Sequence, residues 1–278
     1  MVSFMRCLQY YVKFLIKYVL LRIKSDYFFW KKLGVFDHGK MNEAKYSIGT
    51  FNFFYEVFTK KLGISFEEIT IVEIGPGDSV ALGVLSKLRG ARRSFLIDSG
   101  NFATKDMKFY SELIGQELSM DSFDEMLVRF DINYGTLGLN SLRRIADNSV
   151  NLIISNAVLE HIAPEMLLLY ISEFTRVLGT EGVMIHRVDY RDHLTGGKFH
   201  KSLPGFLSNS DFYLNSIMYL NKLQEDDYFK IFAKNGFQVQ VFDSKKSILD
   251  GQAISTQRSE LKSFTSDVAS SCFICSRD

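Results

Sequence analysis

The sequence predicts an α/β fold, in which a doubly wound, mostly parallel sheet carries helices on both faces and follows an N-terminal helical extension. Three observations lead to this prediction. Residues 69–88 pass from a short apolar run through a glycine turn into a helical pattern. Strand-like and helix-like segments then alternate as far as residue 188, which is typical of parallel sheets because their strands need long crossovers. Residues 1–64 are basic, aromatic and helical in pattern instead.

Composition and length are those of an ordinary globular protein. The chain has 278 residues, of which 46% are hydrophobic and 23% charged, and its net charge is +1. We place one boundary at residue 64, which divides a helical cap (1–64) from the main domain (65–278). No basic patch spreads over the main domain, which argues against nucleic acid as a partner.

The first 24 residues have the pattern of a basic amphipathic helix. Lys13, Lys17, Arg22 and Lys24 interrupt the apolar positions, so no apolar run approaches the roughly 20 residues of a membrane span. A signal peptide is disfavoured for the same reason. Two interpretations remain open: the helix caps the domain or pairs with a second subunit in a homo-oligomer, or it docks on an anionic membrane surface. We expect a cytoplasmic protein, membrane-associated if the second interpretation holds.

The stretch from Ile69 to Leu88 is the first candidate ligand site. A buried strand ends at Ile74, and a glycine turn leads into a helix. Free backbone N–H groups at such a helix start attract negative charge. Gly75 and Gly77 let the backbone turn sharply, and Pro76 stiffens the turn between them.

A second strand, Ser94 to Asp98, ends in an acid about twenty residues after the turn. At that position a carboxylate can hold the ribose of a nucleoside. A dinucleotide fingerprint would also need a third glycine three places after Gly77, where the chain has Val80. An NAD-dependent oxidoreductase is therefore the disfavoured alternative.

The remaining elements follow in order. We predict a helix within 104–118, a third strand within 126–132, a fourth strand at 150–155, a helix at 164–178 and a fifth strand at 183–187. A helix closed by Gly236, a strand from Phe237 to Phe242 and a last strand from Ser271 to Ser276 complete the chain. Cys272 and Cys275 are three apart in that last strand, so they should face opposite sides of the sheet as structural cysteines.

Several of these residues carry a family resemblance. Glu73, Gly75, Pro76 and Gly77 resemble motif I of the class I S-adenosylmethionine-dependent methyltransferases, and Asp98 resembles the acid of that family's second motif. The stretch 146–162, with Leu159-Glu160-His161, resembles the family's fourth strand and the helix start after it, although Asn151 stands where an aspartate is usual. The matches cover roughly residues 69–188. The resemblance implies a Rossmann-like sheet of seven strands, completed by an antiparallel hairpin.

The resemblance also implies S-adenosyl-L-methionine as the cofactor. It assigns five residues to the methionine end of the cofactor, namely Glu73, Gly75, Gly77, Asp78 and Ser79. Asp98 would hold the ribose hydroxyls, Asp131 would approach the adenine amino group, and Asn156 would line the other flank.

Methyl transfer to a hydroxyl needs a base, and histidine is the usual one near neutral pH. His193 is our preferred base, because it lies in the loop after the fifth strand beside Asp189 and Asp192. His161 is the second candidate and would touch acceptor or cofactor, whereas His186 lies inside a strand and should be buried. A metal site would suit the residue types of one larger set, but nothing in the sequence fixes their mutual distances, and we predict no metal site. The set is His186, Asp189, Asp192, His193 and His200.

The predicted function is therefore methyl transfer, most simply to oxygen. The acceptor would be a small molecule, a sugar or a lipid-linked compound. The alternative outside catalysis is a methyltransferase-like module that binds the cofactor without transferring the methyl group.

Overall fold

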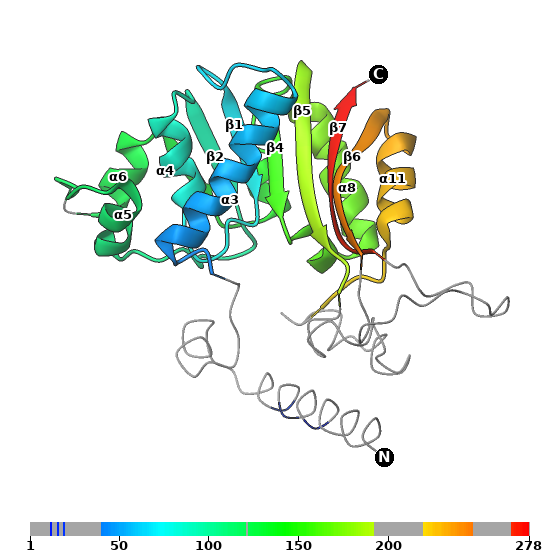
Figure 1. Ribbon diagram of the computed structural model, residues 1–278, viewed down its shortest axis with the longest axis horizontal. Helices are drawn as coiled ribbons and strands as arrows, with labels where there is room; N and C mark the ends of the chain where they lie inside the picture. The colour runs from blue at the N-terminus through cyan, green and yellow to red at the C-terminus, as the bar shows by residue number, and fades with distance from the viewer. Residues whose placement is uncertain are drawn as a thin grey trace, which may run out of the picture.

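The computed structural model describes residues 40–120, 122–191, 219–246 and 268–277, together with residues 12, 16 and 19. Seven strands form one sheet in the order β3-β2-β1-β4-β5-β7-β6 (Figure 1). The strands are β1 (Thr70–Ile74), β2 (Arg93–Ile97), β3 (Ile132–Gly135), β4 (Val150–Asn156), β5 (Leu178–Asp189), β6 (Phe237–Lys246) and β7 (Val268–Arg277). β1 to β5 are parallel, and β7 runs antiparallel to both β5 and β6. The predicted seven-stranded α/β sheet with a terminal hairpin is confirmed.

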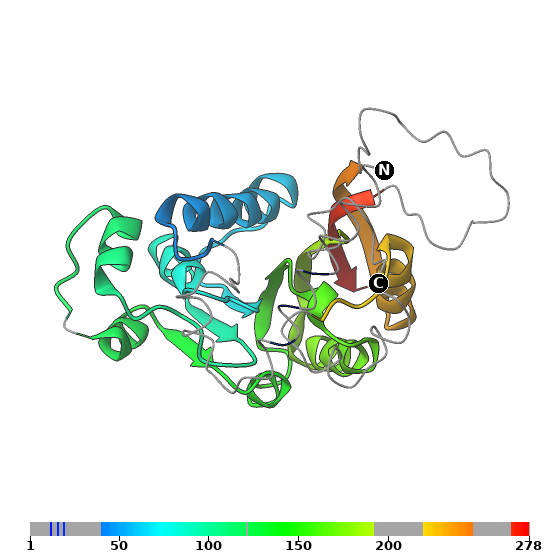
Figure 2. The ribbon, with the colours of Figure 1, turned by 90° about the horizontal axis from the view of Figure 1, so that it is seen from below.

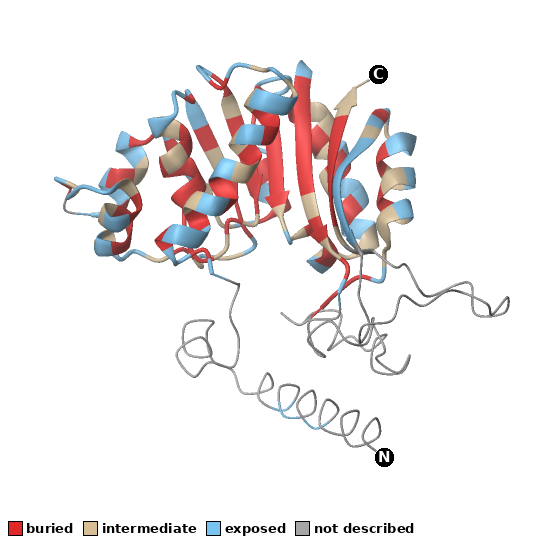
Figure 3. Ribbon diagram, in the orientation of Figure 1, coloured by how far each residue is buried: buried red, intermediate tan, exposed pale blue. Residues whose placement is uncertain are grey.

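Helices cover both faces of the sheet (Figure 2). Those that pack on one face are α3 (Ala44–Glu56), η1 (Val57–Lys61), α4 (Ala81–Leu88), α5 (Met107–Ile114) and α6 (Phe123–Arg129). Those on the other are α7 (Leu139–Leu142), η2 (Leu159–His161), α8 (Pro164–Val177) and α11 (Glu225–Lys234). Because helices cover both faces, the central strands β1 and β4 are buried along most of their length (Figure 3).

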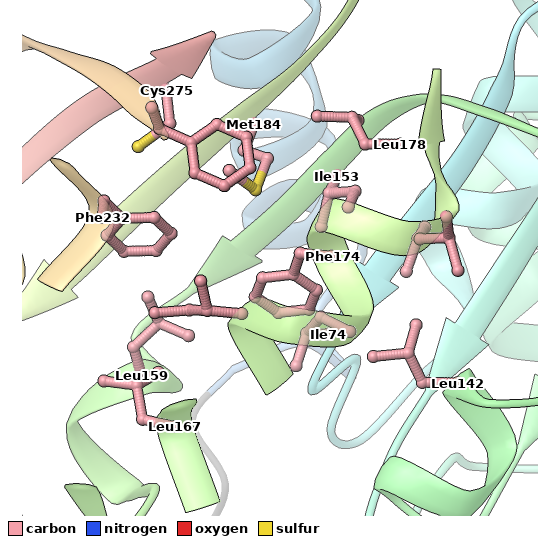
Figure 4. Packing of buried hydrophobic residues seen from close by; sticks show 14 of the residues in the cluster. Ile74, Leu142, Ile153, Leu159, Leu167, Phe174, Leu178, Met184, Phe232 and Cys275 are labelled. Carbon is pink, nitrogen blue, oxygen red and sulfur yellow. The ribbon is translucent and has the colours of Figure 1, made fainter. Parts of the chain in front are cut away.

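α8 shows how the sequence directs this packing. Its apolar residues Leu167, Ile171, Phe174 and Val177 recur every three or four positions and are fully buried, while Pro164 opens its first turn. Figure 4 shows Phe174 and Leu167 in the core between the helix and the sheet. Burying an aromatic or aliphatic side chain of this size stabilises a fold by about 1.5–3 kcal/mol.

The prediction of the third strand within 126–132 is wrong. Residues 123–129 form α6, and β3 begins only at Ile132. Ser122 caps α6, because its side chain accepts a hydrogen bond from the backbone N–H of Glu125. A Ser-x-x-Glu spacing of this kind is the signal of a helix start, and it outweighs the apolar residues that follow.

The other boundaries differ from the prediction by a few residues at most, except that β5, β6 and β7 are longer. Cys272 and Cys275 are both buried on β7 and belong to the cores on opposite sides of the sheet, as predicted. α3 and η1 pack into the core that contains Cys272, through Phe51, Phe54 and Phe58. The domain boundary at residue 64 stays a prediction.

Three residues of the N-terminal segment are described. Val12, Ile16 and Val19 are helical, and their exposed fractions are 47%, 53% and 55%. In the part of the chain that the structure describes, no helix combines the length and apolar character needed to cross a membrane.

Candidate functional site

The turn after β1 brings the backbone close to two neighbouring strands. Gly75 has a φ of +70° and donates its N–H to the carbonyl of Ile97, at 2.8 Å. A Cβ atom on Gly75 would lie 2.4 Å from Cγ2 of Val158, which follows β4. Gly77 has a φ of +66°. Glycine is needed at Gly75 for both reasons, because other residues pay for a positive φ and would collide with Val158.

Asp98 follows β2 at the same edge and binds the turn. Its Oδ2 accepts a hydrogen bond of 2.9 Å from the backbone N–H of Gly77, and its Oδ1 accepts one of 2.7 Å from Ser99. The residue is only 9% exposed. Burial raises the pKa of the Asp98 carboxyl, although both backbone bonds oppose the shift. A carboxylate can accept about four hydrogen bonds, so Asp98 keeps the capacity to accept bonds from a ligand's hydroxyl groups.

Glu73 lies on β1, beside β2 and one residue before the strand ends. It is 4% exposed, and its pKa is raised to about 8, first by burial and then by the negative charge of Asp98. Within the described residues, its Oε2 has no hydrogen-bond partner. A buried acceptor without a partner, next to a second carboxylate, fits a ligand that brings a positive charge or a donor group.

Asp78 and Ser79 are both fully buried, in the same turn. The hydroxyl of Ser79 donates to the carbonyl of Met41, at 2.5 Å, and the hydroxyl of Ser47 donates to the same carbonyl at 2.7 Å. Ser79 thereby ties the turn to the start of α3. Contacts of Asp78 and Ser79 with a cofactor stay predictions.

Asn156 and His161 come from β4 and the turn after it. Asn156 is the last residue of β4, which pairs in parallel with β1, so it shares the carboxyl edge with Glu73 and Asp98. His161 closes the short helix η2 and is exposed. Its Nδ1 lies 2.9 Å from the backbone carbonyl of Tyr219. Sequence reasoning missed Tyr219, because no motif surrounds it.

Asp131 lies at the opposite edge. It precedes β3 and pairs with Lys87, whose Nζ is 2.5 Å from its Oδ2. The expected position, at the carboxyl end of a third strand, depended on the wrong strand boundaries. β3 ends at Gly135, so the residues that it brings to the carboxyl edge are those after Gly135. Among them, Gly138 donates its backbone N–H to the carbonyl of Asp98, at 2.7 Å.

The remaining histidines divide into two groups. His186 is fully buried on β5, with Nδ1 2.8 Å from Oγ of Ser155 and its ring stacked between Phe174 and Phe232. Burial lowers its pKa to about 3, so the ring is neutral and structural, as the sequence predicted. His193, Asp192 and His200 lie outside the described residues. Among the described ones, no three His, Cys, Asp or Glu side chains gather as a metal site would require.

Comparison with known proteins gives a likeness of fold. No protein-family model matches the chain, and neither does any curated protein. The chain is similar to an S-adenosylmethionine dependent methyltransferase from Listeria monocytogenes, at 16% identity, a TM-score of 0.46 and coverage of 79% of this chain and 95% of that one.

It is also similar to magnesium protoporphyrin IX methyltransferase from Synechocystis PCC 6803 with bound SAH, at 15% identity, a TM-score of 0.45 and coverage of 83% and 84%. A third similar structure is a SAM dependent methyltransferase from Archaeoglobus fulgidus, at 13% identity, a TM-score of 0.45 and coverage of 81% of this chain and 98% of that one. At such values the likeness reaches no further than the fold, so the function has to be argued from the residues of this chain.

Proposed function

We propose that this chain is an S-adenosylmethionine-dependent methyltransferase that acts on an oxygen of a small-molecule, sugar or lipid-linked acceptor. One observation carries the proposal: two buried carboxyls, Glu73 and Asp98, lie side by side at the carboxyl edge of the sheet, and Asp98 is fastened to the glycine turn by the N–H of Gly77. Ligands of open α/β sheets bind at that edge.

Each acid suits one part of the cofactor. Asp98 has acceptor capacity left for the two hydroxyls of a ribose, and its backbone bonds fix the direction of that capacity. Glu73 is buried beside a second negative charge, so a ligand that carries an ammonium or sulfonium charge lowers the cost of ionising it. A neutral ligand leaves that cost in place.

Methyl transfer to a hydroxyl requires that the protein align the acceptor with the methyl group and provide a base. When bound, the cofactor supplies an electrophilic methyl group on sulfur. The chain has to hold the acceptor oxygen in line with it and take up the hydroxyl proton. His161, exposed on η2 at the same edge, is our candidate for the proton acceptor within the described residues. His193, the base that the sequence favours, lies outside the described residues and remains a candidate beside it.

Calorimetry with S-adenosylhomocysteine tests cofactor binding. We expect Asp98→Ala to weaken binding by about 1.5–3 kcal/mol, the usual loss for hydrogen bonds to a charged group. Asp131→Ala is the matched control, because it removes an acid from the opposite edge, and it should leave the affinity unchanged. Equal affinities for the wild type and Asp98→Ala would contradict the proposed role of Asp98, and no binding by the wild type would refute the cofactor.

The alternatives make different predictions. A cofactor-binding module without catalysis would bind S-adenosylmethionine but transfer no labelled methyl group to any acceptor pool. An NAD-dependent oxidoreductase would gain thermal stability from NAD instead. Val80 stands against the latter, because it is fully buried in the core at the position where a dinucleotide site needs a third glycine.

For the N-terminal segment we propose peripheral contact with an anionic membrane surface. Val12, Ile16 and Val19 are spaced four and three residues apart, so they share one face of a helix, and each is about half exposed. Residues 1–25 contain no Asp or Glu, and their charged residues are Arg6, Lys13, Lys17, Arg22 and Lys24. Each basic residue near an anionic leaflet contributes about 1 kcal/mol.

Co-sedimentation of the full chain with vesicles tests this contact. We expect binding to phosphatidylserine vesicles that falls with added salt, and loss of that binding in Ile16→Glu. Val128→Glu, at an exposed position on α6, is the control and should bind as the wild type does. Equal binding to uncharged phosphatidylcholine vesicles, or wild-type binding by Ile16→Glu, would refute the contact.

A further inference from the structure

Asn221 is a buried amide whose hydrogen bonds join two distant segments. It is 1% exposed, and its backbone N–H donates to the carbonyl of Glu160, at 2.7 Å. Its Nδ2 donates to the carbonyls of Leu159 and Ile162, both at 2.8 Å. These contacts fasten residues 219–221 to the short helix η2.

The orientation of this amide is fixed by its partners. The carbonyls of Leu159 and Ile162 can only accept hydrogen bonds, so the NH2 group must face them. On the other side, Oδ1 accepts bonds of 3.2 Å from the hydroxyl of Tyr228 and from the backbone N–H of Leu223. A flipped or shortened side chain would remove a donor from both carbonyls, and within the described residues only that of Leu159 would keep another, the backbone N–H of Ile162.

Two residues before Asn221, the carbonyl of Tyr219 lies 2.9 Å from Nδ1 of His161. This oxygen also can only accept, so Nδ1 carries the proton of the hydrogen bond. In the neutral imidazole, the lone pair is then on Nε2.

We propose that Asn221 is a positioning residue, which sets the tautomer of His161 by holding the Tyr219 carbonyl against Nδ1. The inference rests on the proposed function, in which His161 takes the acceptor's proton. Nε2 is the atom that would accept this proton as the acceptor oxygen gains the methyl group and the methyl–sulfur bond breaks, leaving its electron pair on the now neutral sulfur of the departing S-adenosylhomocysteine. The imidazolium would then return the proton to solvent. Without the contacts of Asn221, the carbonyl is no longer held and the other tautomer can form, with Nε2 protonated.

Nuclear magnetic resonance of the full chain, labelled with 15N-histidine, tests the tautomer directly. The spectrum is recorded at about pH 8, above the ordinary histidine pKa of about 6.5, and His161→Asn identifies the signal by its loss. We expect the Nδ1–H form in the wild type. The Nε2–H form in the wild type would overturn the proposal, whether or not any variant folds.

Variants of Asn221 test whether this residue sets the tautomer of His161. Asn221→Ala should convert the His161 signal to a mixture of tautomers, and Asn221→Asp should do so more strongly, because it turns a carboxylate oxygen toward two carbonyls. Tyr228→Phe keeps the amide, removes one bond to Oδ1 and should have a smaller effect. The matched control is Asn235→Ala, which removes an amide that donates to the carbonyl of Ile231 at the end of α11 and should leave the wild-type signal.

Turnover separates a positioning role from a structural one. Asn221→Ala should lower kcat by about 10- to 100-fold, less than the roughly 10²–10⁴-fold loss of a whole general base, with unchanged affinity for S-adenosylhomocysteine. An unchanged tautomer in folded Asn221→Ala, or an equal change in Asn235→Ala, would refute the role of Asn221. The wild type could fail to bind S-adenosylhomocysteine while the tautomer of His161 still changes in Asn221→Ala. The proposed function would then be refuted, and the effect of Asn221 on His161 would stand.

Discussion

Asp98 follows the carboxyl end of β2, and Asp131 precedes the amino end of the neighbouring β3, so the two acids lie at opposite edges of the sheet. Asp98 is buried, and burial raises its pKa. The side chain of Asp131 is 45% exposed, and the hydrogen bond from Lys87 is the main cause of its lowered pKa. The acid at the amino edge is stabilised by its own surroundings, whereas the acids at the carboxyl edge are held where their charge is costly, which is typical of a ligand site.

The largest effect should come from Gly75→Ala at the carboxyl edge. The new Cβ would lie 2.4 Å from Val158 in a residue with a φ of +70°. We expect a loss of about 4 kcal/mol in the free energy of unfolding, from overpacking and left-handed strain together. Denaturant unfolding measures it.

Gly115→Ala is the matched control for that change. Gly115 has the same φ of +70°, but nothing lies within 4 Å of the position of its Cβ. It should cost only the strain, about 1–2 kcal/mol. Equal losses in the two variants would show that the approach of Val158 to the glycine turn carries no energetic weight.

Glu73→Gln should stabilise the protein. The pKa of Glu73 is about 8 in the folded state against an ordinary value of 4.5, so between these values the folded state binds more protons than the unfolded one. Wild-type stability therefore falls as pH rises from about 4.5 to about 8, and the neutral amide abolishes that fall. At pH 7 the gain should be on the order of 3 kcal/mol.

Thermal unfolding of both proteins from pH 5 to pH 8 checks this expectation. Glu112→Gln, at an exposed position on α5, is the control and should follow the wild type. Parallel curves for Glu73→Gln and the wild type over this range would show that Glu73 is ionised in the folded protein.

The smallest effect is expected at the amino edge. Asp131→Asn removes the ion pair with Lys87 but keeps a residue type that tolerates the φ of +50° found there. Because the pair is partly exposed, it should contribute less than ~1 kcal/mol. Since the pKa of Asp131 is lowered, this contribution is present at neutral pH and is lost as pH falls through the folded pKa. A loss as large as that of Gly75→Ala would contradict the contrast between the edges.

Some of this structure follows from local patterns in the chain. The apolar run and the two glycines are neighbours in sequence, and the acid that ends the next strand follows about twenty residues later. The parallel pairing of β1 and β2 brings the ends of both strands to the same edge of the sheet. The same holds for α8, whose apolar spacing identifies its buried face.

Met126 shows the limit of apolar patterns over short stretches. Its neighbourhood fits a strand as well as a helix, and only the cap at Ser122 separates the two. Placing the strand too early moved Asp131 from one edge of the sheet to the other.

The sequence by itself indicated the alternation of strands and helices, the glycine turn and the acids near the ends of the strands on either side of it, because each of these is a local pattern of residues. Only the tertiary structure decided that Asn221 fastens the turn of His161 and that Ser79 bonds to Met41. Asn221 and Leu159 are 62 residues apart, and Ser79 and Met41 are 38 apart. A side chain's partner across such a distance depends on how the whole chain packs, and no local periodicity records it.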